Sequence, residues 1–227
     1  MKKDKSGISG FRKILNILII LGSIGAWLVM VFAKGGMLTD TGFRSLKYFT
    51  VLSNLFEGTA SVIWLIAAGR TGDRAQECLI KAEKIKYAAA VSVALTFMTV
   101  MIFLGPLYGY PEMLAGVNFF LHFAVPVAAL AECIFLSTTI YTHRDNRLAV
   151  VPMLVYGAVY LANNLINGTG EWPDTNDWYG FLNWGLPVGL VIFAGLCTIT
   201  WLTGALLRRI NNYYDRETYR RGGTEQN

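Results

Sequence analysis

The chain has 227 residues, of which 54% are hydrophobic and only 15% are charged. Its charges are confined almost wholly to short segments between long apolar runs, a pattern that is typical of a helical membrane protein and argues against a separate soluble module. The net charge is +5 at pH 7. Because the basic residues flank apolar runs, we interpret the excess as a topology signal and a contact with anionic lipid headgroups, and we expect no nucleic-acid partner.

Six apolar runs are long enough to cross a hydrocarbon core of roughly 30 Å as helices. They are residues 11 to 33, 45 to 69, 86 to 109, 113 to 140, 148 to 167 and 181 to 207. The predicted fold is an all-α integral membrane protein, a six-transmembrane-helix bundle. We expect residues 1–210 to form this single domain and residues 211–227 to form a disordered cytoplasmic tail.

The positions of the basic residues predict the orientation of the bundle. All but three of the 20 basic residues fall in the N-terminal tail, the second connection, the fourth connection and the C-terminal tail. The exceptions are Lys34, Arg44 and Lys47. Lys and Arg in short flanking segments resist translocation, so both termini are expected in the cytoplasm. Arg12 and Lys86 are counted among these flanking charges, and no Lys or Arg is expected at mid-span, which disfavours a retinal pigment or a voltage sensor.

Three predicted helices each carry one polar stripe. The members of each stripe are three or four residues apart, which places them on one helix face. The stripes are Thr50, Asn54 and Glu57 on the second helix, Asn118 and His122 on the fourth, and Tyr156, Tyr160, Asn163 and Asn167 on the fifth. Polar side chains turn inward in lipid, so the stripes are predicted to converge on one cavity in the outer half of the membrane. The alternative is that they only hold helices together by hydrogen bonds.

Two further residues in the fourth helix bear on this cavity. Pro126 removes a backbone donor one turn after His122, so the helix is expected to kink and to free the carbonyl of residue 122. Glu132 lies off the His122 face, where it is either a buried hydrogen-bonding group, protonated in place, or part of a path in the inner half.

The connection after the fifth helix, residues 168 to 179, is acidic, turn-prone and bracketed by Trp172 and Trp178. Aromatic residues at that level most often anchor a protein at the membrane interface. A lid over an outward-facing cavity is the second interpretation.

These polar residues include the parts of an acyl-transfer site. A hydroxyl nucleophile needs a base within hydrogen-bond reach and a donor for the developing oxyanion. Thr50 or Ser53 supplies the hydroxyl, His122 the base, and Asn54, Asn118 or Asn163 the donor. Spacing alone does not choose between Thr50 and Ser53.

The segment Lys47-Tyr48-Phe49-Thr50-Val51-Leu52-Ser53-Asn54-Leu55, the segment from His122 to Pro126, and Tyr156-Gly157 ahead of a Trp-Pro turn resemble the androgen-induced-gene family of membrane proteins and its bacterial relatives. The resemblance spans the second to fifth helices. Characterised members are intramembrane threonine hydrolases of fatty acid esters of hydroxy fatty acids, with a Thr nucleophile and a His partner.

The resemblance implies Thr50 as nucleophile and His122 as base, in a protein of the bacterial plasma membrane. Its partners would be membrane lipids and a lipid-ester substrate, and no cofactor is expected. Residues expected to bind the substrate or the oxyanion are Asn54, Asn118, Asn163, Asn167, Tyr160 and Trp172. Trp172-Pro173-Asp174 stands where the family has a Tyr-Pro-Phe turn, which points to a different headgroup or acyl shape.

Two other functions are compatible with the sequence. A proton- or cation-linked transporter or channel would use Glu57, His122 and Glu132. A non-catalytic protein would only hold lipid in the cavity. A haem carrier is disfavoured because His143 lies in a cytoplasmic turn and cannot pair with His122, and so few His and Cys residues predict no bound transition metal.

Overall fold

The computed structural model describes residues 10–32, 42–171 and 175–224, with side chains as far as Tyr214. Within these residues every regular element is a helix. The elements are α1 (Gly10–Phe32), η2 (Gly42–Lys47), α2 (Phe49–Gly69), α3 (Ala75–Met98), η3 (Thr99–Leu104), α4 (Gly105–Tyr108), α5 (Tyr110–Met113), α6 (Val117–Phe119), η4 (Phe120–Ala124), α7 (Val125–Ala131), η5 (Glu132–Leu136), α8 (His143–Leu148), α9 (Val151–Asn167) and α10 (Leu186–Thr224). The segments η3, η4 and η5 are π-helical.

Six helical segments are long and apolar enough to cross a membrane, which confirms the predicted helical fold and the number of long apolar segments. They are Gly10–Phe32, Phe49–Gly69, Ala75–Tyr108, Val117–Leu136, His143–Asn167 and Leu186–Tyr214.

Several boundaries differ from the prediction by four residues or more, among them three in the third and sixth helices. The third helix begins at Ala75 and not near residue 86, because its first turns are an amphipathic extension with an exposed Glu77–Lys81 ion pair one turn apart. The sixth begins at Leu186, because the residues just before it fold into turns. The last helix, α10, continues to Thr224, so it runs through residue 210, where we predicted the domain to end and a disordered tail to begin.

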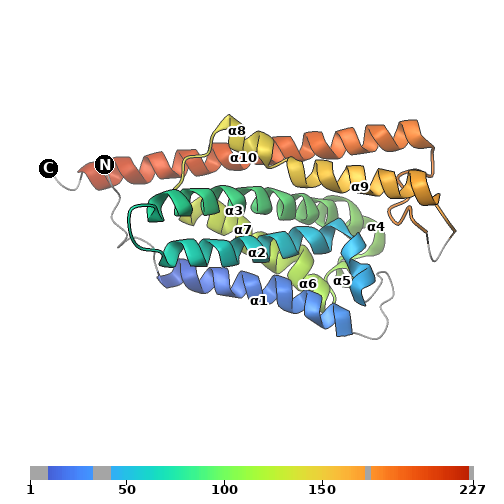
Figure 1. Cartoon of the computed structure of the whole chain (residues 1–227), viewed down its shortest axis with the longest axis horizontal. Coiled ribbons are helices and arrows are strands. Elements are labelled where there is room, and N and C mark those ends of the chain that lie inside the picture. Colours follow the sequence, from blue (N-terminus) through green and yellow to red (C-terminus); the bar gives the residue numbers. More distant parts are fainter. Residues whose placement is uncertain (1–9, 33–41, 172–174, 225–227) are drawn as a thin grey trace.

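Four of the six segments form a compact bundle. Helices α1, α2, α3 and the segment α6–η4–α7–η5 pack against one another, whereas α9 and α10 lie along the other side of α3 (Figure 1). We call the end where α1 begins and α2 ends the basal end, and the opposite end the distal end. This arrangement places α3 in the middle of the molecule.

The sequence of α3 explains why it occupies the centre. An uninterrupted run of its residues is buried on every face: Ala89, Ala90, Val91, Ser92, Val93, Ala94, Leu95 and Thr96. A helix that is apolar all round is suited to a buried position, and small side chains let neighbouring backbones approach closely. Close approach also occurs between α1 and α2, where a Cβ added at Gly58 would clash with the hydroxyl of Ser23.

Candidate functional site

The segments that carry Thr50 and His122 lie next to each other at the distal end of the bundle. Asn54, one turn after Thr50, is fully buried and donates from Nδ2 to the carbonyl oxygen of Leu121 at 2.9 Å. The same nitrogen donates to the carbonyl oxygen of Thr50 at 2.8 Å. Asn54 therefore ties α2 to the π-helical turn η4 at the residue that precedes His122.

A hydrogen bond to a backbone carbonyl fixes the orientation of the His122 ring. It lies in η4, four residues before Pro126, and Val125 N donates to the carbonyl of Phe120 across this wide turn. Pro126 predicts a disruption of the helix in this region, and the structure has a π-helical turn here. The ring Nδ1 lies 2.6 Å from the carbonyl oxygen of Met113. A carbonyl only accepts, so Nδ1 carries the hydrogen and Nε2 of the neutral ring is an acceptor.

The two candidate hydroxyl groups on α2 differ in their surroundings. Ser53 Oγ is buried, 3.0 Å from the hydroxyl of Thr96 on α3, and it also donates to the carbonyl of Thr50 at 3.1 Å. Thr50 is partly exposed. Within the described residues, neither the Thr50 hydroxyl nor Nε2 of His122 makes a hydrogen bond to any group. Ser53 is thus committed to packing α2 against α3, whereas the Thr50 hydroxyl is available for chemistry.

The remaining predicted site residues are dispersed. Asn118, one turn before His122, is partly buried, and its side chain makes no hydrogen bond within the described part of the chain. Asn163 and Asn167 lie on α9, which packs against α3 and α10. Asn167 Nδ2 donates to Asn163 Oδ1 at 2.9 Å on an exposed face. No hydrogen bond among the described residues joins this third stripe to His122, and Trp172 lies outside the described residues.

Tyr160, the last predicted site residue, belongs to an aromatic cluster that closes the distal end. Its hydroxyl donates to Oδ1 of the buried Asp177, whose other oxygen accepts from Leu182 N at 2.9 Å. The neighbouring Tyr179 hydroxyl accepts from Phe49 N at 2.9 Å. Burial raises the pKa of Tyr179 to about 12, so this hydroxyl is neutral at physiological pH. The connection before α10 is thereby fastened to the first residue of α2, directly before Thr50.

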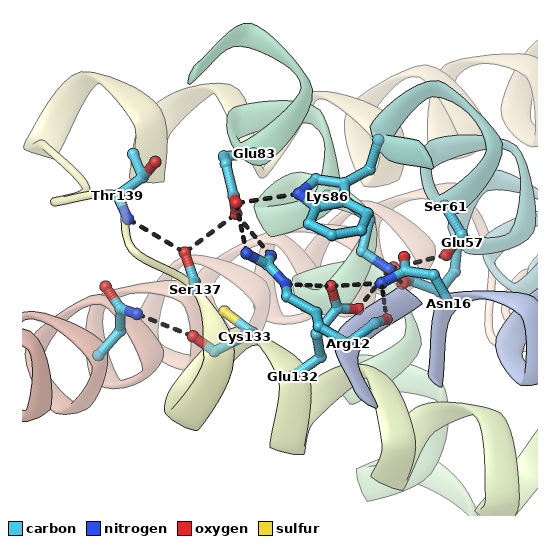
Figure 2. Close-up of polar contacts among 12 residues, drawn as sticks. Arg12, Asn16, Glu57, Ser61, Glu83, Lys86, Glu132, Cys133, Ser137 and Thr139 are labelled. Atoms are coloured by element: carbon cyan, nitrogen blue, oxygen red, sulfur yellow. Dashed lines mark hydrogen bonds and ion pairs between the residues drawn. The ribbon is translucent and has the colours of Figure 1, made fainter. Parts of the chain in front are cut away.

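A second polar cluster lies toward the basal end, and its centre is Arg12 (Figure 2). The guanidinium makes a two-pronged pair with Glu83, with Nη1–Oε1 and Nη2–Oε2 distances of 2.6 and 2.8 Å. Its Nε donates to Oε1 of Glu132 at 2.9 Å. Glu83 also accepts from Trp64 Nε1 at 2.9 Å and from the Ser137 hydroxyl at 3.1 Å. One arginine on α1 therefore links α3 and η5.

Lys86 extends this cluster to α2. Its Nζ lies 2.5 Å from Glu57 Oε1, 2.7 Å from Glu132 Oε2 and 2.8 Å from the Ser61 hydroxyl. Asn16 Nδ2 donates to Glu132 Oε1 at 2.8 Å. We call the five charged residues Arg12, Glu57, Glu83, Lys86 and Glu132 the charge network. Each of them is at most 5% exposed, and every segment of the four-helix bundle contributes at least one.

The charge network corrects one prediction and bears on a second. Arg12 and Lys86 are not membrane-flanking charges: both are buried inside the bundle, where their side chains turn toward carboxylates of other helices. For Lys86 the reason is that α3 begins at Ala75, well before the predicted span. Glu132 is a buried hydrogen-bonding group, as in the first of the two alternatives for it, and it is paired with both of these cations. The sequence does contain a signal for the charge network. Arg12 and Asn16 are four residues apart, as are Glu57 and Ser61, so each pair lies on one helix face.

Among the described residues, no group of three or more His, Cys, Asp or Glu side chains is placed to hold a metal ion. Comparison of the chain with protein-family models, curated proteins and solved structures found no match. The function is therefore inferred from the geometry of the residues themselves.

Proposed function

We propose that the protein is an intramembrane threonine hydrolase that cleaves long-chain lipid esters of the kind in which a fatty acid is esterified to a hydroxy fatty acid. Thr50 is the nucleophile and His122 the general base. The observation that supports this best is the hydrogen bond from His122 Nδ1 to the Met113 carbonyl, which leaves Nε2 as the acceptor. A general base needs such a fixed ring with one free lone pair.

In the proposed reaction, His122 Nε2 takes the proton of the Thr50 hydroxyl as Thr50 Oγ attacks the ester carbonyl. The tetrahedral intermediate collapses to an acyl-threonine, and the alcohol leaves with the proton from His122. Water, activated by the same nitrogen, then attacks the acyl-threonine, releases the fatty acid and restores Thr50. The acyl chains stay in an apolar environment throughout, which suits a substrate that partitions from the bilayer.

Hydrogen bonding also separates the candidates for the oxyanion donor. The amide nitrogen of Asn54 already donates to two carbonyls, at 2.8 and 2.9 Å, so both of its hydrogens are used. The amide group of Asn118 has no hydrogen bond within the described residues and lies one helical turn before His122. We therefore assign Asn118 as the oxyanion donor and Asn54 as the residue that positions α2 against η4.

The proposed setting is the plasma membrane of a bacterium, with both chain termini on the cytoplasmic side. The positive-inside rule supports this orientation, because Lys and Arg concentrate at the basal end and in the tails. In this orientation Thr50 and His122 lie nearer the outer surface, where water reaches the acyl-threonine.

The test is ester hydrolysis by the purified full chain in detergent, with a panel of long-chain acyl esters that includes branched esters of hydroxy fatty acids. Thr50→Val keeps the shape of the side chain and removes the nucleophile, so activity is expected to fall to background. His122→Gln removes the base and is expected to cost about 10²- to 10⁴-fold in rate. Ser53→Ala is the matched control on the same helix and retains activity.

The melting temperature of each variant separates lost chemistry from lost folding. Activity that persists in Thr50→Val, or that disappears equally in Ser53→Ala, would contradict the assignment of the nucleophile. A stable wild-type protein that hydrolyses no member of the panel would contradict the hydrolase proposal itself.

A further inference from the structure

The charge network has an unequal number of positive and negative groups. Among the described residues, the three carboxylates of Glu57, Glu83 and Glu132 meet only two cationic side chains, Arg12 and Lys86. If all five were ionised, the network would carry one net negative charge. An uncompensated charge in a low-dielectric interior is strongly unfavourable, even after the surrounding structure relaxes. One additional positive charge is therefore needed.

The contacts of each carboxylate identify where that charge resides. Glu83 receives hydrogen bonds at both oxygens, from Arg12, Trp64 and Ser137. Glu132 receives them at Oε1 from Arg12 and Asn16, and its Oε2 lies 2.7 Å from the Lys86 ammonium. Both are well stabilised as anions.

Glu57 is different. Its Oε1 is paired with Lys86, but its Oε2 is fully buried and has no hydrogen-bond partner. In the same network, Asn16 Oδ1 is also a buried acceptor without a hydrogen-bond donor. Two such acceptors at one place indicate a missing hydrogen, because buried polar atoms are nearly always satisfied. A proton on Glu57 would do both: it supplies a hydrogen-bond donor and it removes the excess negative charge.

Among the described residues, the neighbours offer no other source of positive charge. Glu57 pairs with Lys86 from α3, which bridges it to Glu132 of η5 and to Ser61 on its own helix. Arg12 and Asn16 of α1 and Glu83 of α3 join the network through Glu132 and through Arg12. A cavity of about 10 Å³, lined by Arg12, Glu83, Lys86 and Glu132 among others, has room for one water molecule. Two cationic side chains line that cavity, which disfavours a bound metal cation there and favours a proton on the carboxyl group.

We propose that the charge network is a proton-binding site, in which Glu57 holds one exchangeable proton inside the four-helix bundle. The site is separate from Thr50 and His122, and its occupancy does not depend on ester hydrolysis. Loss of the proton returns the network to one net negative charge, so the packing of all four bundle segments is coupled to the occupancy of this site.

The test is infrared spectroscopy of the purified full chain at neutral pH, before and after exchange into heavy water. Wild-type protein is expected to show the carbonyl stretch of a buried, protonated carboxylic acid, shifted by deuterium. The band is lost in Glu57→Gln and retained in Glu112→Gln, the control at an exposed glutamate of the distal end. Absence of the band in wild-type protein overturns the proposal, whatever the variants do.

Melting temperature gives an independent readout. Gln has the shape and charge of a protonated Glu, so Glu57→Gln is expected to melt at the wild-type temperature, whereas Glu83→Gln melts several degrees lower because Arg12 loses its partner. A Glu57→Gln variant that is as unstable as Glu83→Gln, or that does not fold, means that Glu57 is ionised and overturns the proposal. A melting temperature that rises with sodium concentration in wild-type protein, and not in Glu57→Gln, overturns it in favour of a sodium site.

Discussion

The two ends of the four-helix bundle use buried polar residues in opposite ways. At the basal end, every side-chain nitrogen of Arg12 and Lys86 donates to a carboxylate or hydroxyl of another helix. At the distal end, the Thr50 hydroxyl, the Nε2 of His122 and the amide of Asn118 make no hydrogen bond within the described residues. A polar group in an apolar bundle is costly unless it is satisfied. The paired groups of the basal end hold the helices together, whereas the unpaired groups of the distal end are those that the proposed function assigns to the substrate.

This comparison explains why mutation of the two ends should have different effects. Removing an ionised member of the charge network leaves its partners charged and buried, so the main loss is stability. Removing the Thr50 hydroxyl leaves no hydrogen-bond partner behind, and removing His122 leaves only the Met113 carbonyl without its donor, so the main loss expected is activity.

The largest effect on stability is expected for Arg12→Met. The substitution keeps much of the side-chain volume but leaves Glu83 and Glu132 without their shared cation. Breaking a buried ion pair on one side costs about 3–5 kcal/mol. Lys13→Met, at the exposed neighbouring position, is the matched control and should unfold like the wild type. Equal unfolding free energies for the two variants would mean that Arg12 contributes nothing beyond a surface charge.

A smaller effect is expected for Tyr160→Phe at the distal end. The change removes the hydroxyl that donates to the buried Asp177, so the carboxylate keeps only the hydrogen bonds from its own connection. The expected cost is about 1–3 kcal/mol, the usual penalty for a buried acceptor that loses its donor. Tyr213→Phe, at an exposed tyrosine of α10, serves as the control. A stability change of the same size in both variants would show that the Asp177 contact is not responsible.

The helices themselves were predictable because hydropathy along the chain is a local property. Six long apolar runs and the disruption at Pro126 follow from composition and from a missing backbone donor. The place of Asn54 on a buried face follows from its spacing to Thr50. The choice of Thr50 over Ser53 did not follow, because it depends on Thr96, which lies in another helix.

The charge network was missed for a similar reason. Arg12 and Lys86 lie near the ends of predicted apolar runs, where a basic residue usually marks the membrane surface. Their partners are far away in the chain: Arg12 pairs with Glu83 and Glu132, and only the folded arrangement brings these together. The dispersal of Asn163 and Asn167 has the same origin, because one-dimensional spacing shows which residues share a face but not which helix that face meets.

Asn54→Leu tests whether the geometry of the proposed active site depends on the hydrogen bond from the Asn54 side chain to the Leu121 carbonyl. Hydrogen bonds between membrane helices contribute about 0.6 kcal/mol on average and up to about 1.7 kcal/mol. The loss of the bond to the Leu121 carbonyl should therefore lower stability only slightly. Ester hydrolysis should fall by a larger factor, because Thr50 and His122 are no longer fixed relative to each other. Asn167→Leu, at an exposed amide on α9, should leave both measurements unchanged.

The smallest effect is expected for Lys84→Ala, which tests whether burial or charge explains the strength of the network. Lys84 lies on α3 between Glu83 and Lys86 in the sequence and pairs with Asp145 at 3.0 Å, but its side chain is 41% exposed. Solvent screens the exposed ammonium, and the buried Asp145 carboxylate keeps its hydrogen bonds from Thr142, so the loss of Lys84 should cost less than about 1 kcal/mol, measured by thermal or detergent-induced unfolding. If Lys84→Ala is as damaging as Arg12→Met, the stability of the basal end depends on the total charge around α3. If it is nearly silent, the basal end is held by the few charges that lipid and water cannot reach.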